Sequence, residues 1–283
     1  MNQKKFYSLK EVKIRCTEGR FFSYSDWFDK IFIPLSMYFV WLFVNLRISA
    51  NIISWISAFF AIVAAILISC QNPIYIIIGS FFYLIYYLFD YIDGAVARFN
   101  RTSGVSGQYI DWIMHVISSS AIMSGIAIGA ISSTGNWLIP FCILSVVSSI
   151  LTYARYSMAW FAIIMDNQQR RSKGLDMDKI TLETSIYKRE YFLYDFIRKC
   201  VCKFYHEETL IFSLPILAFL HYFISYTYID FRVLLVVGGG LFYFPVMVIE
   251  IQKLASSKKI PEASYKLFKS NEKPVLPDDH FFK

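Results

Sequence analysis

The chain has 283 residues, of which 56% are hydrophobic and 19% aromatic, and it carries a net charge of +7. Its mean hydropathy of +0.46 is too high for a soluble domain, and several uncharged runs reach the roughly 20 residues that a bilayer-spanning helix requires. The basic residues lie between these runs, where anionic lipid headgroups explain them better than nucleic acid does. We therefore expect an all-α integral membrane protein that does not bind nucleic acid.

Residues 1–50 are expected to form a cytosolic arm followed by an amphipathic helix in the membrane interface. The segment Trp27–Leu46 is rich in aromatic residues, but it contains Pro34 and two flanking charges, so it is a marginal span. Counting it as a span also places the arm on the wrong side in the charge analysis below. The first ten residues contain no apolar stretch, so we expect no cleaved signal peptide.

Residues 51–252 are expected to form a catalytic domain of six transmembrane helices. The expected spans are Asn51–Cys70, Ile74–Arg98, Gly107–Ile131, Trp137–Ala162, Glu207–Tyr226 and Arg232–Ile249. The turn Gln71-Asn72-Pro73 separates the first two spans, and Gly104 helps to break the next connection. A polar connection at about 166–206 and a basic tail at 253–283 are expected to be cytosolic.

The distribution of Lys and Arg predicts the orientation. The arm, the turn that contains Arg101, the long connection and the tail are basic, whereas the turns near Gln71, near Ser133 and at Ser225–Asp230 contain no Lys or Arg. Six spans separate these two groups onto opposite sides and place both termini in the cytosol. We expect the chain in the bacterial inner (cytoplasmic) membrane, with its chemistry on the cytosolic side.

That chemistry is expected between residues 90 and 115, at the ends of two apolar segments. A helix places Asp90 and Asp93 on one face, and the i, i+4, i+8 spacing aligns Gly107, Asp111 and His115 on a second face. A carboxylate at membrane depth costs about 2.5–3.5 kcal/mol unless it has a partner. Three carboxylates in one place therefore predict a bound divalent cation, and hard oxygen ligands favour Mg²⁺ or Mn²⁺ over zinc.

The pattern D-x-x-D-G-x-x-A-R, eight further residues and then G-x-x-x-D resembles the signature of the CDP-alcohol phosphotransferases. All seven fixed positions and every spacing are present. They are Asp90, Asp93, Gly94, Ala97, Arg98, Gly107 and Asp111. The six-span layout with a preceding interfacial helix is also similar to that family. The family's P-N-x-x-T element is only partly matched, because Ala50 replaces its Pro and Ser54 its Thr, while Asn51 is kept.

The resemblance implies an enzyme that transfers a substituted phosphoryl group from a CDP-linked alcohol to an acceptor hydroxyl and releases CMP. It implies that Asp90, Asp93 and Asp111 hold one or two metal ions, with Asp111 also counted as catalytic. The implied substrate-binding residues are Gly94, Ala97, Arg98, Gly107, Asn51 and Ser54. A homodimer is typical of the family, and membrane lipids are expected partners.

One position departs from the family pattern. The family ends the motif with a fourth Asp to which it assigns the role of general base, and this chain has His115 there. Neutral imidazole is a competent base near pH 7, so we expect His115 to be that base. Two alternatives stay open: His115 serves as a metal ligand or hydrogen-bond donor, or the chain binds nucleotide without catalysis.

Several other residues have a structural and a functional interpretation. Arg155 either extends to the membrane interface or binds an acidic acceptor or the donor phosphate. Cys200, Cys202 and His206 are half of a zinc site at most, and the five cysteines are expected to be free thiols. Glu207 is expected to be an acid favoured by a helix N-terminus. The glycines at 238–240 permit close helix packing or a dimer face.

The substrates are left open by the sequence. A lipid donor such as CDP-diacylglycerol would make a phospholipid headgroup, whereas a polar CDP-alcohol or CDP-phosphonate would decorate a diacylglycerol or a lipid-linked glycan. A cation-coupled transporter is the alternative of another class, because buried acids also mark ion pathways. The clustering of the acids at one mouth argues against it.

Overall fold

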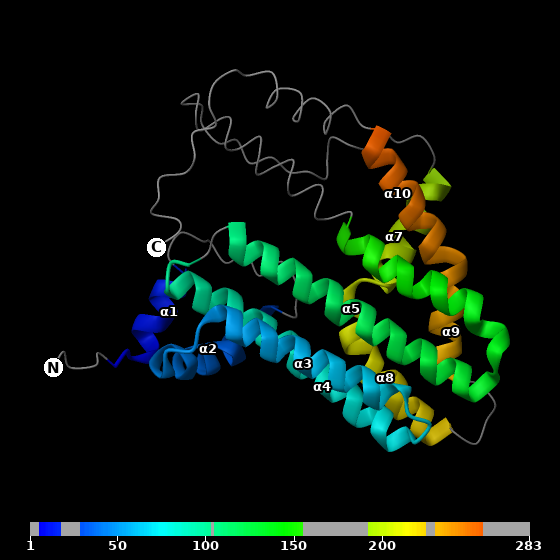
Figure 1. The fold of residues 1–283 in the computed structure, drawn as a ribbon. Coiled ribbons are helices and arrows are strands. Elements are labelled where there is room, and N and C mark those ends of the chain that lie inside the picture. Colours follow the sequence, from blue (N-terminus) through cyan, green and yellow to red (C-terminus); the bar gives the residue numbers. More distant parts are fainter. Residues whose placement is uncertain (1–5, 18–28, 103–104, 155–191, 225–229, 257–283) are drawn as a thin grey trace. The chain divides into compact units, whose positions relative to one another are not determined.

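The structure is a computed structural model that describes residues 6–17, 29–102, 105–154, 192–224 and 230–256 (Figure 1). These residues form helices and contain no strand. The helices before residue 135 are α1 (Leu9–Thr17), α2 (Asp29–Leu46), α3 (Ala50–Ser69), α4 (Pro73–Phe99) and α5 (Val105–Thr134). The later elements are η1 (Asn136–Leu138), a helix over residues 139–154, α7 (Phe192–Phe204), α8 (Glu207–Ile224), α9 (Phe231–Gly238), the π-helical turn η2 (Gly239–Tyr243) and α10 (Phe244–Ser256).

Five segments are long and apolar enough to cross a membrane, judged by length and composition. They are Ala50–Ser69, Pro73–Phe99, Tyr109–Thr134, Asn136–Ala154 and Phe231–Lys253. The expected fifth span corresponds to α8, whose apolar part, Thr209–Phe223, is shorter, as is Lys30–Leu46 in α2. The prediction of an all-α membrane protein is therefore confirmed, and the count of six spans stays a prediction.

Local sequence explains where the first spans begin. The Ser49 side chain accepts a hydrogen bond from the backbone N–H of Ile52 and caps α3. Asn72 caps α4 in the same way through Ile74, and Pro73 occupies the first helical turn, where no N–H is needed. The turn predicted from Gln71-Asn72-Pro73 is thus the start of α4.

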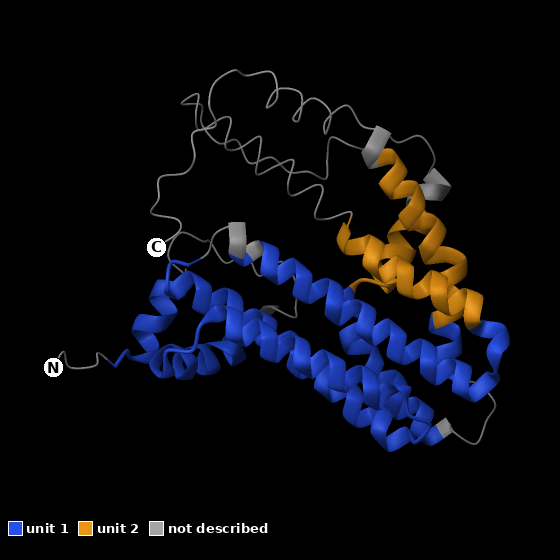
Figure 2. Cartoon of the chain, viewed as in Figure 1, with its two compact units in different colours: residues 1–138, 207–235 blue, residues 139–206, 236–283 orange. Residues whose placement is uncertain are grey.

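The chain forms two compact units (Figure 2). Unit 1 consists of residues 1–138 and 207–235, and unit 2 of residues 139–206 and 236–283. In unit 1, α3 packs against both α4 and α5. The contact is close because small residues line it: a Cβ at Gly79 would lie 2.9 Å from the Ala64 carbonyl oxygen, and one at Gly125 would overlap the Ala65 backbone.

The opposite face of α3 is apolar and exposed. Its exposed residues recur every three or four positions: Ile52, Trp55, Phe59, Ile62 and Ile66. A continuous stripe of this kind is unfavourable in water but is compatible with contact to lipid. The packing of α3 therefore agrees with its assignment as a membrane span.

The first two helices of unit 1 pack beside the end of α4. In α1, Ser8 and Glu11 form a capping box, with the Ser8 N–H and the Glu11 N–H each bonded to the other's side chain. Cys16 is buried in a core that includes Val96, and its thiol donates to the Ala95 carbonyl. Burial raises the pKa of the Cys16 thiol to about 11 against the opposing charge of Arg98, so it is a free but unreactive thiol.

A buried ion pair joins the turn after α3 to the start of α9. Arg232 is 1% exposed, and its guanidinium donates to Asp230 through Nε and Nη2. Its Nη1 donates to the carbonyls of Ile68 and Cys70, and Nη2 also donates to Gln71 Oε1. We call this group (Ile68, Cys70, Gln71, Asp230 and Arg232) the arginine clamp. All guanidinium nitrogens in it have acceptors, so the buried charge is fully compensated.

Unit 2 packs the helix over residues 139–154 against η2. A Cβ at Gly239 would overlap Ser145 Oγ, and a Cβ at Gly240 would lie 3.0 Å from Phe141 Cα. These two glycines therefore serve close packing within the chain. Beside them, the rings of Tyr205 and Tyr243 stack with centroids 4.8 Å apart, and the Tyr243 hydroxyl hydrogen-bonds Thr152.

Candidate active site

The acidic motif lies where α4 ends and α5 begins, both in unit 1. Asp90 and Asp93 belong to the last part of α4, and Asp111 and His115 to the second and third turns of α5. His115 Nε2 lies 3.4 Å from Asp90 Oδ1 and 3.7 Å from Asp111 Oδ1. The predicted convergence of the two helix faces is therefore present in the structure. We call Asp90, Asp93, Asp111 and His115 the acidic cluster.

The acidic cluster is graded from buried to exposed. Asp93 is 7% exposed, whereas the side chains of His115, Asp90 and Asp111 are 18%, 24% and 42% exposed. Asp93 interacts electrostatically with the other three. The cluster is thus open on the side of Asp111, where a water-soluble ligand can reach it.

Ser54 fixes the most buried carboxylate. Its hydroxyl lies 2.6 Å from Asp93 Oδ2 and itself sits one turn into α3, whose start is capped by Ser49. A hydroxyl that donates to a carboxylate at this distance forms a strong, charge-assisted hydrogen bond. Ser54 therefore acts on Asp93 directly, which the partial P-N-x-x-T match did not reveal.

The donor set fits a divalent cation. One ligand atom from each of Asp90, Asp111 and His115 can be chosen so that all three lie within 4.8 Å of one another. Asp93 lies outside this triple and is held by Ser54. Three carboxylates around one point repel one another in a low-dielectric site, and a cation relieves that repulsion. Carboxylate oxygens suit Mg²⁺ or Mn²⁺.

Two residues that the sequence analysis did not assign to the site, Glu207 and Tyr86, contact His115. Glu207, the first residue of α8, is 11% exposed, and its Oε2 lies 3.2 Å from His115 Nδ1. Tyr86, four residues before Asp90 on α4, donates its hydroxyl to Glu207 Oε1 at 2.6 Å, and the same oxygen lies 3.0 Å from His115 Nδ1. The sequence analysis assigned Glu207 only the role of an acid at a helix N-terminus.

The remaining predicted residues surround the end of α4. A Cβ at Gly94 would lie 3.3 Å from Arg98 Nη1, so the Arg98 side chain passes directly over this glycine. The Ala97 carbonyl accepts from the Thr102 N–H and closes the turn after α4. Gly107 is half-buried in the first turn of α5, and Asn51 is exposed in the first turn of α3. Arg155 lies outside the described residues.

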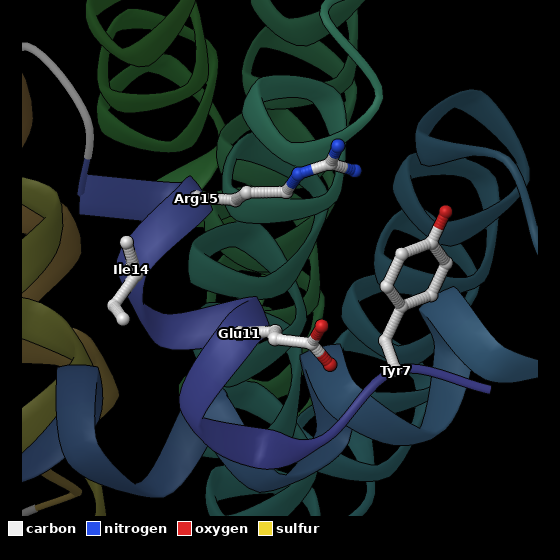
Figure 3. A pocket seen from close by; sticks show the side chains of 4 residues that line it. All are labelled: Tyr7, Glu11, Ile14 and Arg15. Carbon is white, nitrogen blue, oxygen red and sulfur yellow. The ribbon is translucent and has the colours of Figure 1, made fainter. Parts of the chain in front are cut away.

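Neither the Cys200–His206 segment nor the pocket beside α1 contains a comparable group of metal-ligating side chains. Among the described residues, the acidic cluster supplies the only grouping of three metal-ligating side chains, and Cys200, Cys202 and His206 are not part of one. A surface pocket of about 270 Å³ beside α1 is lined by Tyr7, Glu11, Ile14 and Arg15 (Figure 3). Pockets that bind small molecules typically enclose about 300–1,000 Å³, so this hollow is small.

The fold and the site define an integral membrane protein with a polar, acidic site at one end of its helices. Residues 47–182, nearly half of the chain, match the family model of the CDP-alcohol phosphatidyltransferases. The match includes the whole acidic cluster. No curated protein matches the chain.

The family match confirms the resemblance predicted from the motif. It implies a transferase that moves an alcohol-bearing phosphoryl group from a CDP-alcohol to an acceptor hydroxyl, in the setting of membrane phospholipid synthesis. The family also uses a divalent metal, in agreement with the Asp90–Asp111–His115 grouping. A transferase is thereby favoured over a cation-coupled transporter.

Proposed function

We propose that this protein is a metal-dependent CDP-alcohol phosphotransferase in which His115 is the general base, acting in phospholipid or lipid-linked glycan headgroup synthesis. The observation that supports this most directly is the position of His115 Nε2, 3.4 Å from Asp90 and 3.7 Å from Asp111, within the segment that matches the family. An imidazole therefore stands where the family's pattern has its last carboxylate.

Asp90, Asp93 and Asp111 would hold one or two Mg²⁺ or Mn²⁺ ions. The bound cation would supply positive charge that stabilises the diphosphate of the donor and the CMP that leaves. The chain's own contribution is to fix these carboxylates: Asp93 through Ser54, and Asp111 through its place one turn before His115.

The transfer step then needs one proton acceptor. His115 Nε2 takes the proton of the acceptor hydroxyl, whose oxygen forms a bond to the phosphorus that carries the alcohol. The anhydride P–O bond to CMP breaks, and its electron pair leaves with the CMP phosphate. Proton removal by a positioned side chain contributes about 10²–10⁴-fold to such a rate.

The residues around the end of α4 would bind the donor. Gly94, Ala97 and Gly107 offer little bulk, so the nucleotide can approach the backbone, and Arg98 would pair with phosphate. Asn51 and Arg155 are proposed as further substrate-binding residues. The exposed start of α3 supports this for Asn51.

We also propose that both termini and the site face the cytosol of a bacterial inner membrane, and that the protein is a homodimer. The basic arm, connection and tail support this orientation. In this arrangement residues 1–50 form the arm and interfacial helix, residues 51–252 the six-span catalytic domain and residues 253–283 the cytosolic tail.

The deciding experiment measures CMP release by purified protein in nanodiscs with Mg²⁺. One arm supplies CDP-diacylglycerol with soluble alcohols, and the other supplies polar CDP-alcohols with mixed lipid acceptors. Release in the first arm alone identifies a phospholipid synthase, and release in the second alone identifies a headgroup- or glycan-decorating enzyme. If neither arm releases CMP and His115→Asp restores release, the wild-type chain is not a catalyst.

A further inference from the structure

We infer that Glu207, together with Tyr86, is a positioning residue that fixes the tautomer of His115 so that Nε2 faces the acidic cluster with its lone pair. The inference rests on the proposed function, because it assigns Glu207 a role in the base step. It also adds Glu207, the first residue of α8, to a site whose sequence motif ends at residue 115. The family match ends at residue 182 and does not include Glu207.

Two oxygens, from Tyr86 and Glu207, lie close to His115 Nδ1. The Tyr86 hydroxyl donates its single proton to Glu207 Oε1 at 2.6 Å. With that proton committed, the Tyr86 oxygen that lies 3.0 Å from Nδ1 can only accept. Glu207 Oε2, 3.2 Å from Nδ1, is a carboxylate oxygen and also accepts. Both neighbours of Nδ1 therefore require a proton on that nitrogen.

The opposite ring nitrogen faces the reaction. Nε2 lies 3.4 Å from Asp90 and 3.7 Å from Asp111, distances longer than a short hydrogen bond. A neutral imidazole carries one N–H, so a proton held at Nδ1 leaves the lone pair on Nε2 when a cation occupies the Asp90 and Asp111 oxygens. That lone pair is the group a base needs, and it points toward the carboxylates that would hold the metal and the donor diphosphate.

The supporting residues are themselves held in place. The Tyr86 ring is buried and stacks on Tyr83 with centroids 5.4 Å apart and planes 5° apart. The Tyr86 carbonyl accepts from Ser57 on α3, and Glu207 opens α8, which packs on α4. In Ser-His-Asp enzymes a carboxylate beside Nδ1 likewise orients an imidazole whose Nε2 serves as the base.

The test combines a spectroscopic and a kinetic measurement on the full chain in nanodiscs. The ¹⁵N chemical shifts of labelled histidine report which ring nitrogen carries the proton, and they are recorded with diamagnetic Mg²⁺ present so that a cation occupies the carboxylates beside Nε2. The chain has four histidines, so the His115 signals are assigned by their loss in His115→Gln. We expect the Nδ1–H form in the wild type and a mixed or Nε2–H form in Glu207→Ala.

The kinetic expectation for Glu207→Ala is a kcat lower by about 10²-fold, within the range for general-base catalysis, and a KM for the donor within about threefold. Glu207→Gln keeps an acceptor oxygen for Nδ1–H, so it should retain the Nδ1–H form and lose less activity than Glu207→Ala. Tyr86→Phe keeps the ring stack and should cost about threefold to tenfold, because one of two acceptors remains. Glu11→Gln, at the start of α1, and Tyr87→Phe are the matched controls and should leave kcat unchanged.

Two results would overturn the inference. One is an Nε2–H wild-type ring. The other is a Glu207→Ala protein whose His115 tautomer and kcat equal those of the wild type. If Glu207→Ala does not fold, Glu207→Gln and Tyr86→Phe decide by the same two measurements. An Nδ1–H ring in a protein that releases no CMP from any donor would instead reject the proposed function and leave the positioning of His115 standing.

Discussion

Two polar groups lie at opposite ends of the helices of unit 1, and they are built on opposite principles. The arginine clamp joins one guanidinium and one carboxylate, 1% and 7% exposed, with carbonyl and amide oxygens that use its remaining donors. The acidic cluster collects three carboxylates around a single imidazole and leaves Asp111 42% exposed. The clamp is complete without a ligand, whereas the cluster has an excess of acceptors that a cation would satisfy.

The sharpest comparison replaces one Asp by Asn in each group. Asp93→Asn removes a buried negative charge from a repulsive cluster, so CMP release should fall by about three orders of magnitude, because metal-held charge supplies several kcal/mol. The melting temperature should be unchanged or higher, because the variant has one fewer negative charge in a cluster of like charges. Asp230→Asn should do the reverse: it lowers the melting temperature and spares the activity of the folded fraction.

Melting in detergent and CMP release per folded molecule test both halves. Binding of Mn²⁺, followed by titration calorimetry, separates a lost metal from a lost substrate. A stable Asp93→Asn protein with full activity would remove the distinction between the two groups.

The second prediction concerns the clamp itself. Arg232→Met leaves Asp230 buried without its partner, which should cost about 3–5 kcal/mol of unfolding free energy. The double variant Arg232→Met with Asp230→Leu removes both charges and should recover most of that loss. Denaturant titration in mixed micelles measures the difference, and equal destabilisation of the single and double variants would show that the charges do not account for the clamp.

The two groups also differ in how far the sequence predicts them. The spacing of Asp90, Asp93, Asp111 and His115 is local, so helical periodicity alone brings each pair onto one face. The turn at Asn72 was predicted from its own residue types. The partner of Tyr86, by contrast, is 121 residues away at Glu207, and a spacing rule within one helix contains no information about it.

The clamp was missed for the same reason. The sequence predicts Arg232 only as the first residue of a span, whereas its guanidinium donates to the carbonyl of Ile68, 164 residues earlier. Its charge is cancelled by Asp230, so it does not act as a free basic residue in the charge distribution that predicts orientation. Helical periodicity predicts the helix face on which a residue lies, but tertiary packing determines which distant residue it contacts.

A third prediction tests whether the cluster depends on its support as the clamp does. Ser54→Ala removes the hydroxyl that lies 2.6 Å from Asp93 Oδ2 and should lower metal affinity by about 10- to 100-fold, as changes behind metal ligands typically do. Ser54→Thr keeps the hydroxyl and is the matched control. The dependence of CMP release on Mn²⁺ concentration gives the apparent metal affinity of each variant. Equal affinities of Ser54→Ala and Ser54→Thr would exclude a role for this hydrogen bond.

The smallest expected effect is the pH dependence of the clamp. Burial alone would raise the pKa of Asp230, but hydrogen bonds from Arg232 and its charge outweigh burial and lower that pKa. A carboxylate whose folded pKa lies below its unfolded value of about 3.9 contributes stability that is complete above that pH and is lost as pH falls through the folded pKa. The melting temperature of the wild type should therefore fall more steeply below about pH 4 than that of Asp230→Asn, and both proteins should respond alike between about pH 5 and 8. Parallel melting curves over the acidic range would mean that the ionised form of Asp230 contributes nothing to the clamp.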